Sequence, residues 1–213
     1  MKCCVVISAG QINNYERAKS FIHKNDFFIF CDAGLCHAEG LGIVPDVIVG
    51  DFDSCDEATL SKYEAGGDKE IIRLPREKDD TDTFFAVKLA LERGYDEFLF
   101  LGSMGARFDH MLGNISILVY LHENHKNAVL VDDYSFMKIV GSESFFIEDS
   151  CSYFSVLTVA GDVSGVSIKN AKYPLENANL SCNFQLGISN EVLPNQTASV
   201  SVQNGCVLVV VVN

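Results

Sequence analysis

The segment Gly50-Asp51-Phe52-Asp53-Ser54 places two carboxylates one residue apart at the end of an apolar run. Residues 47–49 are all apolar and predict a short buried strand that ends at Gly50. Carboxylates in that position repel each other and lose solvation, so a positive charge must usually balance them, and a divalent cation such as Mg²⁺ is the commonest. An Asp-rich turn that caps the following helix would use the same residues. This segment alone leaves the metal site and the turn as open interpretations.

A second acidic segment, Lys78-Asp79-Asp80-Thr81-Asp82, lies where a helix is expected to begin. Asp79 and Asp82 are three residues apart, so both can face one ligand if the first turn is helical. The N-terminus of a helix also offers free N–H groups to a phosphate. Ordinary capping of the helix explains the same residues and is the commoner role for one such segment.

The segment from Gly102 to His110 combines two glycines with an arginine and an aspartate. Glycines let the backbone approach a ligand closely, and the planar guanidinium of Arg107 suits phosphate oxygens. Asp109 and His110 then begin a helix that carries Asn114 on the same face as His110. The alternative is a surface Arg–Asp pair and a core histidine, which is the commoner outcome for a single segment of this kind.

Charge and missing motifs exclude several classes of function. The net charge of −13 argues against a general nucleic-acid binder, which needs a basic surface. An acidic chain can still bind a nucleotide if metal ions and a few Arg or Lys residues bridge the two. The motif G-x-x-x-x-G-K-[ST] does not occur, so a P-loop kinase is not supported. No G-x-G-x-x-G follows the first predicted strand, which weakens a dinucleotide-dependent oxidoreductase.

Composition and cysteine usage favour an ordinary soluble protein of a reducing compartment. The chain is 48% hydrophobic and 21% charged, and no uninterrupted apolar stretch reaches about 18 residues, so we expect no transmembrane helix. The segment before Ser8 and Gly10 is too short for a signal peptide. The eight cysteines form no C-x-x-C pair, which argues against a zinc site, and a cytoplasmic location fits best.

The chemical segments need elements that bring them together, and the first 132 residues alternate strands with helices. Strands are expected at residues 3–7, 27–31, 47–49, 70–74, 97–101 and 128–131, and helices at residues 14–23, 35–41, 56–64, 81–93 and 109–123. Such repeated units imply parallel strands with helices on both faces of the sheet. The unusual polar residues and glycines each follow a strand: Gly10, Asp32, Asp51, Asp79 and Gly102. Ligands of open α/β sheets bind beyond the carboxyl ends of the strands, so one shared site is predicted.

From about Tyr134 the helical pattern is replaced by short strand-like runs separated by turn residues. Strands are expected at residues 136–140, 144–147, 153–159, 163–168, 197–202 and 207–212. This pattern predicts an all-β domain, a sandwich or a flattened barrel. The last run is apolar on both pleat faces, which predicts a central strand or part of a subunit interface.

Five segments occur in a fixed order along the chain: Asp32-Ala33-Gly34, Gly42-Ile43-Val44-Pro45-Asp46, Gly50-Asp51-Phe52-Asp53-Ser54, Lys78-Asp79-Asp80-Thr81-Asp82 and Gly105-Ala106-Arg107-Phe108-Asp109-His110. In order and spacing they resemble the motif series of the thiamine pyrophosphokinase (thiamin diphosphokinase) family. Lys172-Tyr173-Pro174-Leu175 and Gly187-Ile188-Ser189-Asn190-Glu191 are similar to its thiamine-side segments. The resemblance covers nearly the whole chain. It departs at Ala33, where the family usually has Gly, and at Tyr173, where many members have Trp.

The resemblance implies a fold, an activity and an assembly. The expected fold is a Rossmann-like parallel α/β domain, residues 1–132, followed by an antiparallel β-sandwich, residues 133–213. The expected activity is Mg²⁺-dependent transfer of a diphosphoryl group from ATP to the hydroxyl of thiamine, with release of AMP. A homodimer whose thiamine site lies between subunits is also implied. A diphosphokinase acting on a hydroxymethyl-pterin and a nucleotide-sensing module without activity are the alternatives, since fold alone does not establish activity.

The resemblance also implies roles for individual residues. Catalysis is assigned to Asp51, Asp53, Asp82, Arg107 and Asp109, the first three as Mg²⁺ ligands. ATP is assigned to a larger set near the carboxyl ends of the strands: Asp32, Gly34, Lys78, Asp79, Gly105, Arg107, His110 and Asn114. Thiamine is assigned to Tyr173, Ser189 and Asn190. The identity of the group that takes the hydroxyl proton stays open.

Overall fold

The computed structural model describes residues 2–77, 79–105 and 107–213 of the chain. The chain forms two compact units. The first contains Met1–Ile117 and Glu123–Asp133, and the second contains Leu118–His122 and Tyr134–Asn213. Within the described residues, none of the helices combines the length and the apolar character needed to cross a membrane.

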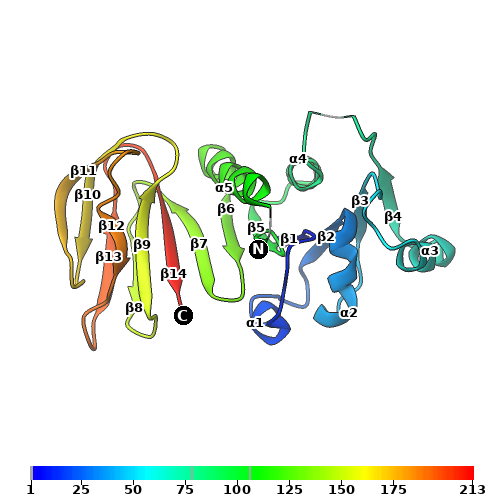
Figure 1. Ribbon diagram of the computed structural model, residues 1–213, viewed down its shortest axis with the longest axis horizontal. Helices are drawn as coiled ribbons and strands as arrows, with labels where there is room; N and C mark the ends of the chain where they lie inside the picture. The colour runs from blue at the N-terminus through cyan, green and yellow to red at the C-terminus, as the bar shows by residue number, and fades with distance from the viewer. Residues whose placement is uncertain (1, 78, 106) are drawn as a thin grey trace. The chain divides into compact units, whose positions relative to one another are not determined.

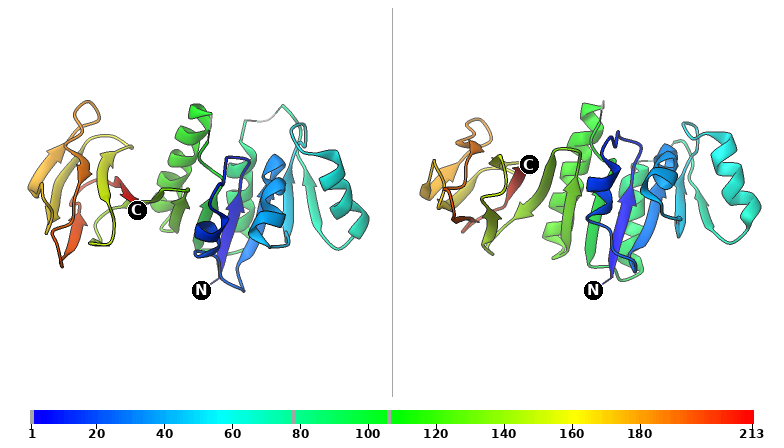
Figure 2. Two further views of the ribbon diagram at one scale, coloured as in Figure 1. Left: turned by 60° about the horizontal axis from the view of Figure 1, so that its bottom comes forward. Right: turned by 90° about the horizontal axis from the view of Figure 1, so that it is seen from below.

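The strands of the first unit form a parallel sheet. They are β1 (Cys3–Ile7), β2 (Phe27–Cys31), β3 (Val47–Gly50), β4 (Glu70–Arg73), β5 (Glu97–Leu101) and β6 (Asn127–Val131). They lie side by side in the order β6-β5-β1-β2-β3-β4 (Figure 2). β2, β3 and β4 follow one another on one side of β1, whereas β5 and β6 lie on its other side. The strand order therefore reverses between β1 and β5, which makes this point of the sheet a topological switch point.

Helices connect these strands and cover both faces of the sheet. They are α1 (Tyr15–Lys19), the 3-10 helix η1 (Asp32–His37), α2 (Ala38–Leu41), α3 (Glu57–Gly66), α4 (Asp82–Glu92) and α5 (Phe108–Glu123). Figure 1 shows α1 and α2 on one side of the parallel strands and α4 on the other. Right-handed crossovers require this arrangement, because the connection from β4 to β5 runs back across the sheet in the opposite direction.

Local sequence signals begin and end the helices. Asn14, Asp56 and Thr81 cap α1, α3 and α4, since each side chain accepts a hydrogen bond from a backbone N–H three residues later. The helix expected at residues 14–23 ends earlier, at Lys19. Phe21 and Ile22 donate their N–H groups to carbonyls only three residues back, so the chain tightens out of the α-helical pattern there.

The strands of the second unit are antiparallel. They are β7 (Ser135–Val140), β8 (Phe145–Glu148), β9 (Tyr153–Thr158), β10 (Val163–Lys169), β11 (Leu175–Leu180), β12 (Gly187–Asn190), β13 (Thr197–Ser201) and β14 (Val207–Val212). One group has the order β12-β9-β14-β7 and another the order β11-β10-β13-β8. Buried residues from both groups, such as Phe154 and Val209 of the first and Val166 and Val200 of the second, pack into one apolar cluster.

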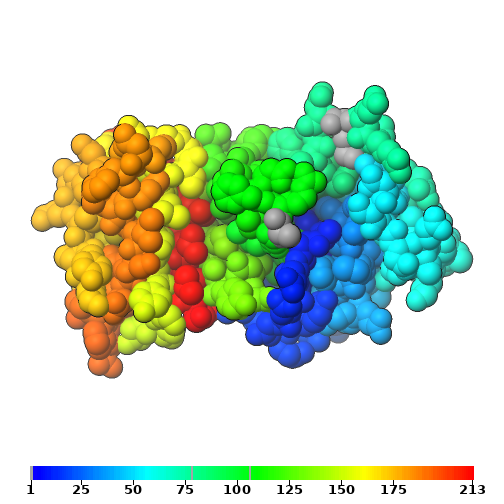
Figure 3. All heavy atoms as spheres, in the orientation of Figure 1, coloured from blue at the N-terminus to red at the C-terminus, as the bar shows by residue number. Residues whose placement is uncertain are grey.

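The apolar last strand is central, as its sequence predicts. β14 pairs with β7 along one edge and with β9 along the other, and its residues form the red band in Figure 3. Val207, Leu208 and Val209 are at most 3% exposed. The strands β11 and β12 were not predicted, because the sequence of β11 is largely polar and exposed and β12 is short and begins with glycine.

Candidate functional site

The loops that follow β1 and β5 meet at the switch point of the first unit. The N–H of Gly10 donates a hydrogen bond to the carbonyl oxygen of Gly102 over 2.6 Å. A Cβ at Gly10 would lie 2.2 Å from the carbonyl oxygen of Met104, so only glycine fits at this position. The two loops are thus packed backbone against backbone where ligands of such sheets bind.

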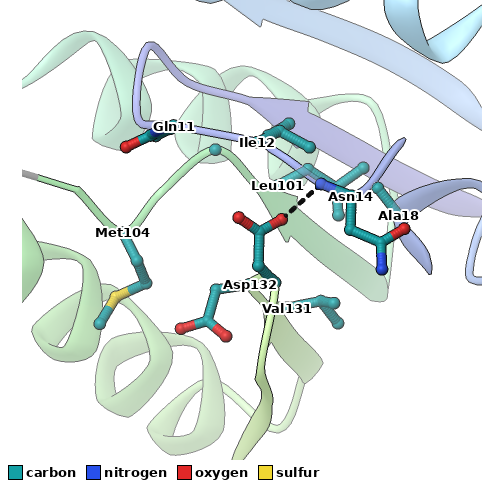
Figure 4. A pocket seen from close by; sticks show the side chains of 10 residues that line it. Gln11, Ile12, Asn14, Ala18, Leu101, Met104, Val131 and Asp132 are labelled. Carbon is teal, nitrogen blue, oxygen red and sulfur yellow. Dashed lines mark hydrogen bonds between the residues drawn. The ribbon is translucent and has the colours of Figure 1, made fainter. Parts of the chain in front are cut away.

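A small hollow opens between these loops and the end of β6. In Figure 4, Gln11 and Met104 lie on one side of it, and Asn14 and Ala18 lie on the other. Asp133 follows β6 and accepts a hydrogen bond from the N–H of Asn14 over 2.8 Å. This carboxylate therefore ties the β1–α1 loop to the end of β6.

Buried polar side chains fix the same loops from behind. The hydroxyl of Ser8, at the end of β1, lies 2.9 Å from the hydroxyl of Thr83 in the first turn of α4. Ser103 follows β5, and its carbonyl oxygen accepts a hydrogen bond of 2.6 Å from the side-chain amide of Asn114 in α5. Asn114 is 8% exposed, so its side chain is buried and holds the loop at Ser103 in place.

Three carboxylates gather at the ends of β2 and β3. Asp32, Asp51 and Asp53 each offer an oxygen, and these oxygens lie within 4.8 Å of one another. The Oδ1 atom of Asp32 is buried and has no hydrogen-bond partner among the described residues. Burial raises the pKa of Asp32, and the charges of neighbouring carboxylates raise it further. A buried, unpartnered oxygen within a group of carboxylates fits a hard divalent cation such as Mg²⁺.

The local backbone brings these carboxylates together. Asp32 has a φ of 47°, in the left-handed region that Asp tolerates better than most residues. Two residues later, a Cβ at Gly34 would lie 2.5 Å from the carbonyl oxygen of Ile7, so η1 packs closely against the end of β1. On the β3 side, the N–H of Asp53 donates to Oδ1 of Asp51 over 3.1 Å, which folds that loop into a tight turn.

The second acidic segment contributes differently from the first. Asp82 is the first residue of α4, and its charge is one of those that raise the pKa of Asp32. It therefore lies near the carboxylate group, although it is not one of the three residues whose oxygens lie within 4.8 Å of one another. Asp79 is exposed in the loop before α4. Lys78 lies outside the described residues.

Arg107 and Asp109 form an ion pair where α5 begins. Nη2 of Arg107 lies 2.6 Å from Oδ2 of Asp109, and Nε donates to Oδ1 over 3.2 Å. The hydrogen bond from Arg107 lowers the pKa of Asp109 to about 2. Both side chains are about two-thirds exposed, at 69% and 66%, so they are open to a ligand. His110 is exposed beside them, and Gly105 is exposed with its Cβ position 3.3 Å from Cα of Gly10.

The predicted thiamine residues lie together in the second unit. The amide of Asn190 bonds both backbone groups of Tyr173, accepting from its N–H over 3.0 Å and donating to its carbonyl over 2.7 Å. Asn190 is 2% exposed, so this amide positions the Tyr173 loop. Tyr173 is 57% exposed, and the ammonium of Lys172 lies 5.7 Å from the centroid of its ring. Ser189 is exposed with a φ of 55°, and its N–H donates to the hydroxyl of Ser155.

Sequence reasoning placed Asp32 with the nucleotide and not with the metal ligands. A signal was present, because Asp32 and Asp51 end consecutive strands, and consecutive strands are usually neighbours in a sheet. The buried contact between Ser8 and Thr83 was not foreseen either, nor was the contact of the buried His37 with the carbonyl oxygen of Gly10. Ser, Thr and His occur at similar positions without any role, so no sequence signal distinguished them.

Models of one protein family match both halves of the chain. The model "Thiamin pyrophosphokinase, catalytic domain" matches residues 18–130, and the model "Thiamin pyrophosphokinase, vitamin B1 binding domain" matches residues 146–207. Among known relatives, the chain is similar to thiamine pyrophosphokinase of Bacillus subtilis, with 28% identity over 195 residues that cover 91% of each chain. It is also similar to thiamine pyrophosphokinase 1 of Oryza sativa subsp. japonica, with 28% identity over 70% of this chain and 59% of the relative.

Solved structures are similar over the full length of the chain. The crystal structure of thiamine pyrophosphokinase from Bacillus subtilis superposes with a TM-score of 0.88 and 26% identity, covering 100% of this chain and 99% of that one. Thiamin pyrophosphokinase from Candida albicans gives a TM-score of 0.81 at 16% identity, covering 99% of this chain and 90% of that one. At that lower identity, the similarity concerns the fold alone.

Proposed function

Because the chain belongs to the thiamin pyrophosphokinase family, we propose that it is a transferase that moves a diphosphoryl group from ATP to thiamine. The products are thiamine diphosphate and AMP. The observation that carries this proposal within the structure is the group of carboxylates Asp32, Asp51 and Asp53 beside the switch point of the α/β unit. An enzyme that transfers a diphosphoryl group needs a cation site and a phosphate site next to each other, and we assign both to this unit.

The proposed reaction joins the hydroxyethyl oxygen of thiamine to the β-phosphorus of ATP. The bond between that phosphorus and the oxygen of the α-phosphate breaks, AMP leaves, and a carboxylate of the site accepts the hydroxyl proton. We propose Asp51, Asp53 and Asp82 as Mg²⁺ ligands and add Asp32, because its oxygens lie within the same group. Mg²⁺ held there would offset the negative charge of the triphosphate.

Basic and backbone groups of the same unit complete the proposed nucleotide site. Arg107, held by Asp109, presents its guanidinium to the phosphates, and Lys78 assists it. The remaining proposed ATP residues position loops or line the carboxyl edge of the sheet: Asp32, Gly34, Asp79, Gly105, His110 and Asn114. Of these, Asn114 acts through the loop that it holds at Ser103.

Thiamine is proposed to bind beside Tyr173 and Ser189. The exposed ring of Tyr173 offers a π face to the positive thiazolium, as Trp would in many members of the family. Asn190 contributes by holding the backbone of Tyr173.

The finer architecture and setting are part of the same proposal. The reversal of strand order supports a Rossmann-like first unit, and the shared apolar cluster supports a β-sandwich in the second. All of the cysteines are free thiols in the described chain, which supports a cytoplasmic location. We further propose a homodimer in which each thiamine site combines the α/β unit of one chain with the β unit of the other.

Release of AMP from ATP is the experiment that tests the function. We expect release that depends on both thiamine and Mg²⁺, with thiamine diphosphate formed in equal amount. A hydroxymethyl-pterin offered in place of thiamine should give no AMP. Release with the pterin alone would identify a different acceptor, and binding of ATP without release for either acceptor would indicate a nucleotide-sensing module.

The shared site is tested by mixing two inactive variants. Asp82→Asn damages the α/β unit, and Ser189→Trp blocks the proposed thiamine pocket. If sites are shared between chains, half of the dimers that refold together are mixed, and each mixed dimer holds one undamaged site. Activity should then return to about a quarter of that of the wild type. Mixed dimers confirmed by mass spectrometry but without activity would show that each site lies within one chain.

A further inference from the structure

His37 is a buried histidine with two specific hydrogen bonds, and neither the family's motif series nor the proposed mechanism uses it. It is the last residue of η1 and is 7% exposed. Its Nε2 atom lies 2.8 Å from the carbonyl oxygen of Gly10, and its Nδ1 atom lies 2.9 Å from the hydroxyl of Tyr15. The imidazole therefore joins three segments: η1, the β1–α1 loop and α1.

The partners fix where the protons lie. The carbonyl oxygen of Gly10 can only accept, so Nε2 of His37 must carry the hydrogen that it donates. In the neutral ring Nδ1 then has a lone pair, which accepts the hydroxyl hydrogen of Tyr15. Burial lowers the pKa of His37, although the Gly10 carbonyl opposes this, and burial raises the pKa of Tyr15. Both side chains are accordingly neutral, and each has one hydrogen-bonding role.

Tyr15 is held in position by a close contact with α2. A Cβ at Gly40 would lie 2.4 Å from Cζ of Tyr15, so the ring occupies the space that any side chain at position 40 would need. The rings of Tyr15 and His37 are 5.9 Å apart between centroids and are tilted by 56°. The Tyr15 hydroxyl is therefore presented to Nδ1 of His37 by packing as well as by the hydrogen bond.

Gly10, whose carbonyl accepts this hydrogen bond, also contacts the loop that follows β5. The N–H of Gly10 donates to Gly102, and Gly10 approaches the backbone of Met104 too closely for any side chain. The other end of η1 is Asp32, one of the three clustered carboxylates. The short helix η1 thus begins with a proposed metal ligand, Asp32. It ends with His37, whose hydrogen bond to Gly10 holds the loops that follow β1 and β5.

We propose that His37, oriented by Tyr15, is a positioning residue that sets the distance between the carboxylate group and the loops at the switch point, and so tunes the binding of the nucleotide triphosphate. This inference rests on the proposed function, because it assigns those loops to the phosphates. His37 itself touches neither substrate. It acts through the carbonyl of Gly10, and its effect should fall on ATP and not on thiamine.

Three substitutions separate this role from simple packing. His37→Gln keeps an N–H donor at the position of Nε2, His37→Leu removes it, and Tyr15→Phe removes only the hydroxyl that orients the ring. His23→Leu is the matched control, because His23 is an exposed histidine of the same unit, with 81% of its side chain accessible. For each variant, kcat and the two KM values are measured, together with binding of a non-hydrolysable ATP analogue in the presence of Mg²⁺ and absence of thiamine.

Loss of one buried hydrogen bond of this kind should change affinity about tenfold. We expect His37→Leu to raise the KM for ATP and the Kd of the analogue by about that factor, with the KM for thiamine within about twofold. His37→Gln should restore most of the loss, and Tyr15→Phe should raise the KM for ATP by about threefold through the weakened orientation of the ring. The wild type should show an unprotonated Nδ1 and a protonated Nε2 at His37 in ¹⁵N NMR spectra.

Several results would overturn the inference. These are a lowered kcat with both KM values unchanged, equal losses in the Gln and Leu variants, or a protonated Nδ1 in the wild type. If His37→Leu does not fold, a wild-type KM for ATP and a wild-type Kd for the analogue in Tyr15→Phe would be sufficient to overturn the inference. Failure of the proposed function is a separate outcome, because the wild type itself would then release no AMP when thiamine is added.

Discussion

Asp32 offers a substitution that should separate stability from activity. Its carboxylate is half-buried, its Oδ1 atom has no hydrogen-bond partner among the described residues, and two further carboxylates lie beside it. Asn has nearly the same shape as Asp and tolerates the φ of 47° at this position. The variant Asp32→Asn therefore removes a charge with little change in geometry.

The size of the effect follows from the separation of the charges. The clustered oxygens lie within 4.8 Å of one another, and two unit charges at that upper limit repel by about 1 kcal/mol in water and by about 3.5 kcal/mol at an effective dielectric constant of about 20. The lower figure applies here, because Asp53 is exposed and Asp51 is partly exposed. Relief of two such repulsions should stabilise the metal-free protein by about 2 kcal/mol, or about 4 to 8 °C in Tm for a chain of this size.

Thermal unfolding in EDTA and in excess Mg²⁺ measures this effect, and AMP release measures the cost to function. Asp32→Asn should unfold at a higher temperature than the wild type in EDTA, gain less stability from Mg²⁺, and turn over at least about 100-fold more slowly. Asp68→Asn, at an exposed position, is the control and should leave all three quantities nearly unchanged. Lower stability than the wild type in EDTA, or an unchanged response to Mg²⁺, would refute the reasoning.

Three further predictions follow from the site. The first concerns the carboxylates proposed as Mg²⁺ ligands, in the variants Asp51→Asn, Asp53→Asn and Asp82→Asn. Each should lower turnover at least about 100-fold at saturating Mg²⁺ with an unchanged circular dichroism spectrum, and near-normal turnover would remove that residue from the mechanism. Arg107→Lys should lower kcat/KM for ATP at least about tenfold, because it keeps the charge but loses the planar fork; wild-type kinetics would mean that Arg107 is only a surface cation. Burial raises the pKa of Asp133, but the N–H groups of Asn14 and Asn13 lower it by more, so its pKa in the folded protein is below the unfolded value. The ionised carboxylate therefore stabilises the fold fully above the unfolded pKa of about 3.9. This stabilisation is lost as the pH falls through the lower pKa of the folded protein. In Asp133→Asn, Tm should therefore decrease less than in the wild type as the pH is lowered below about 4. An equal decrease in Tm for the variant and the wild type would count against this.

The alternation of strands and helices in the first unit could be read from the sequence because buried parallel strands are continuous apolar runs. β1 is an example, since Cys4 through Ile7 are fully buried. β11 and β12 could not be read in this way. β11 has the sequence Leu-Glu-Asn-Ala-Asn-Leu. Three of its six residues are exposed, and the strand is defined by its pairing with β10. Pairing with a neighbouring strand leaves no local pattern in the sequence of a polar segment.

The place of the candidate site could be predicted, but the partner of each side chain could not. Polar residues after strands identified the carboxyl edge of the sheet. Residue type shows that Asn190 and Asn114 can bond a ligand, but it does not show that their amides bond backbone groups of Tyr173 and Ser103 instead. These partners lie 17 and 11 residues away along the chain and are set by the packing of the loops, which residue type does not reveal.

That packing also explains why the chain tolerates one departure from the motif of its family. The family usually has two glycines after the aspartate, whereas this chain has Ala33 followed by Gly34. Ala33 is not among the residues with positive φ in the described chain, so a side chain is accommodated there without backbone strain. At Gly34 a Cβ would meet the backbone of Ile7 at 2.5 Å, and relief would require η1 to move away from β1. Such a movement would carry Asp32 and His37 with it, since they are the two ends of the same helix. The positions of the carboxylate group and of the hydrogen bond between His37 and Gly10 therefore both depend on Gly34, the glycine that this chain keeps.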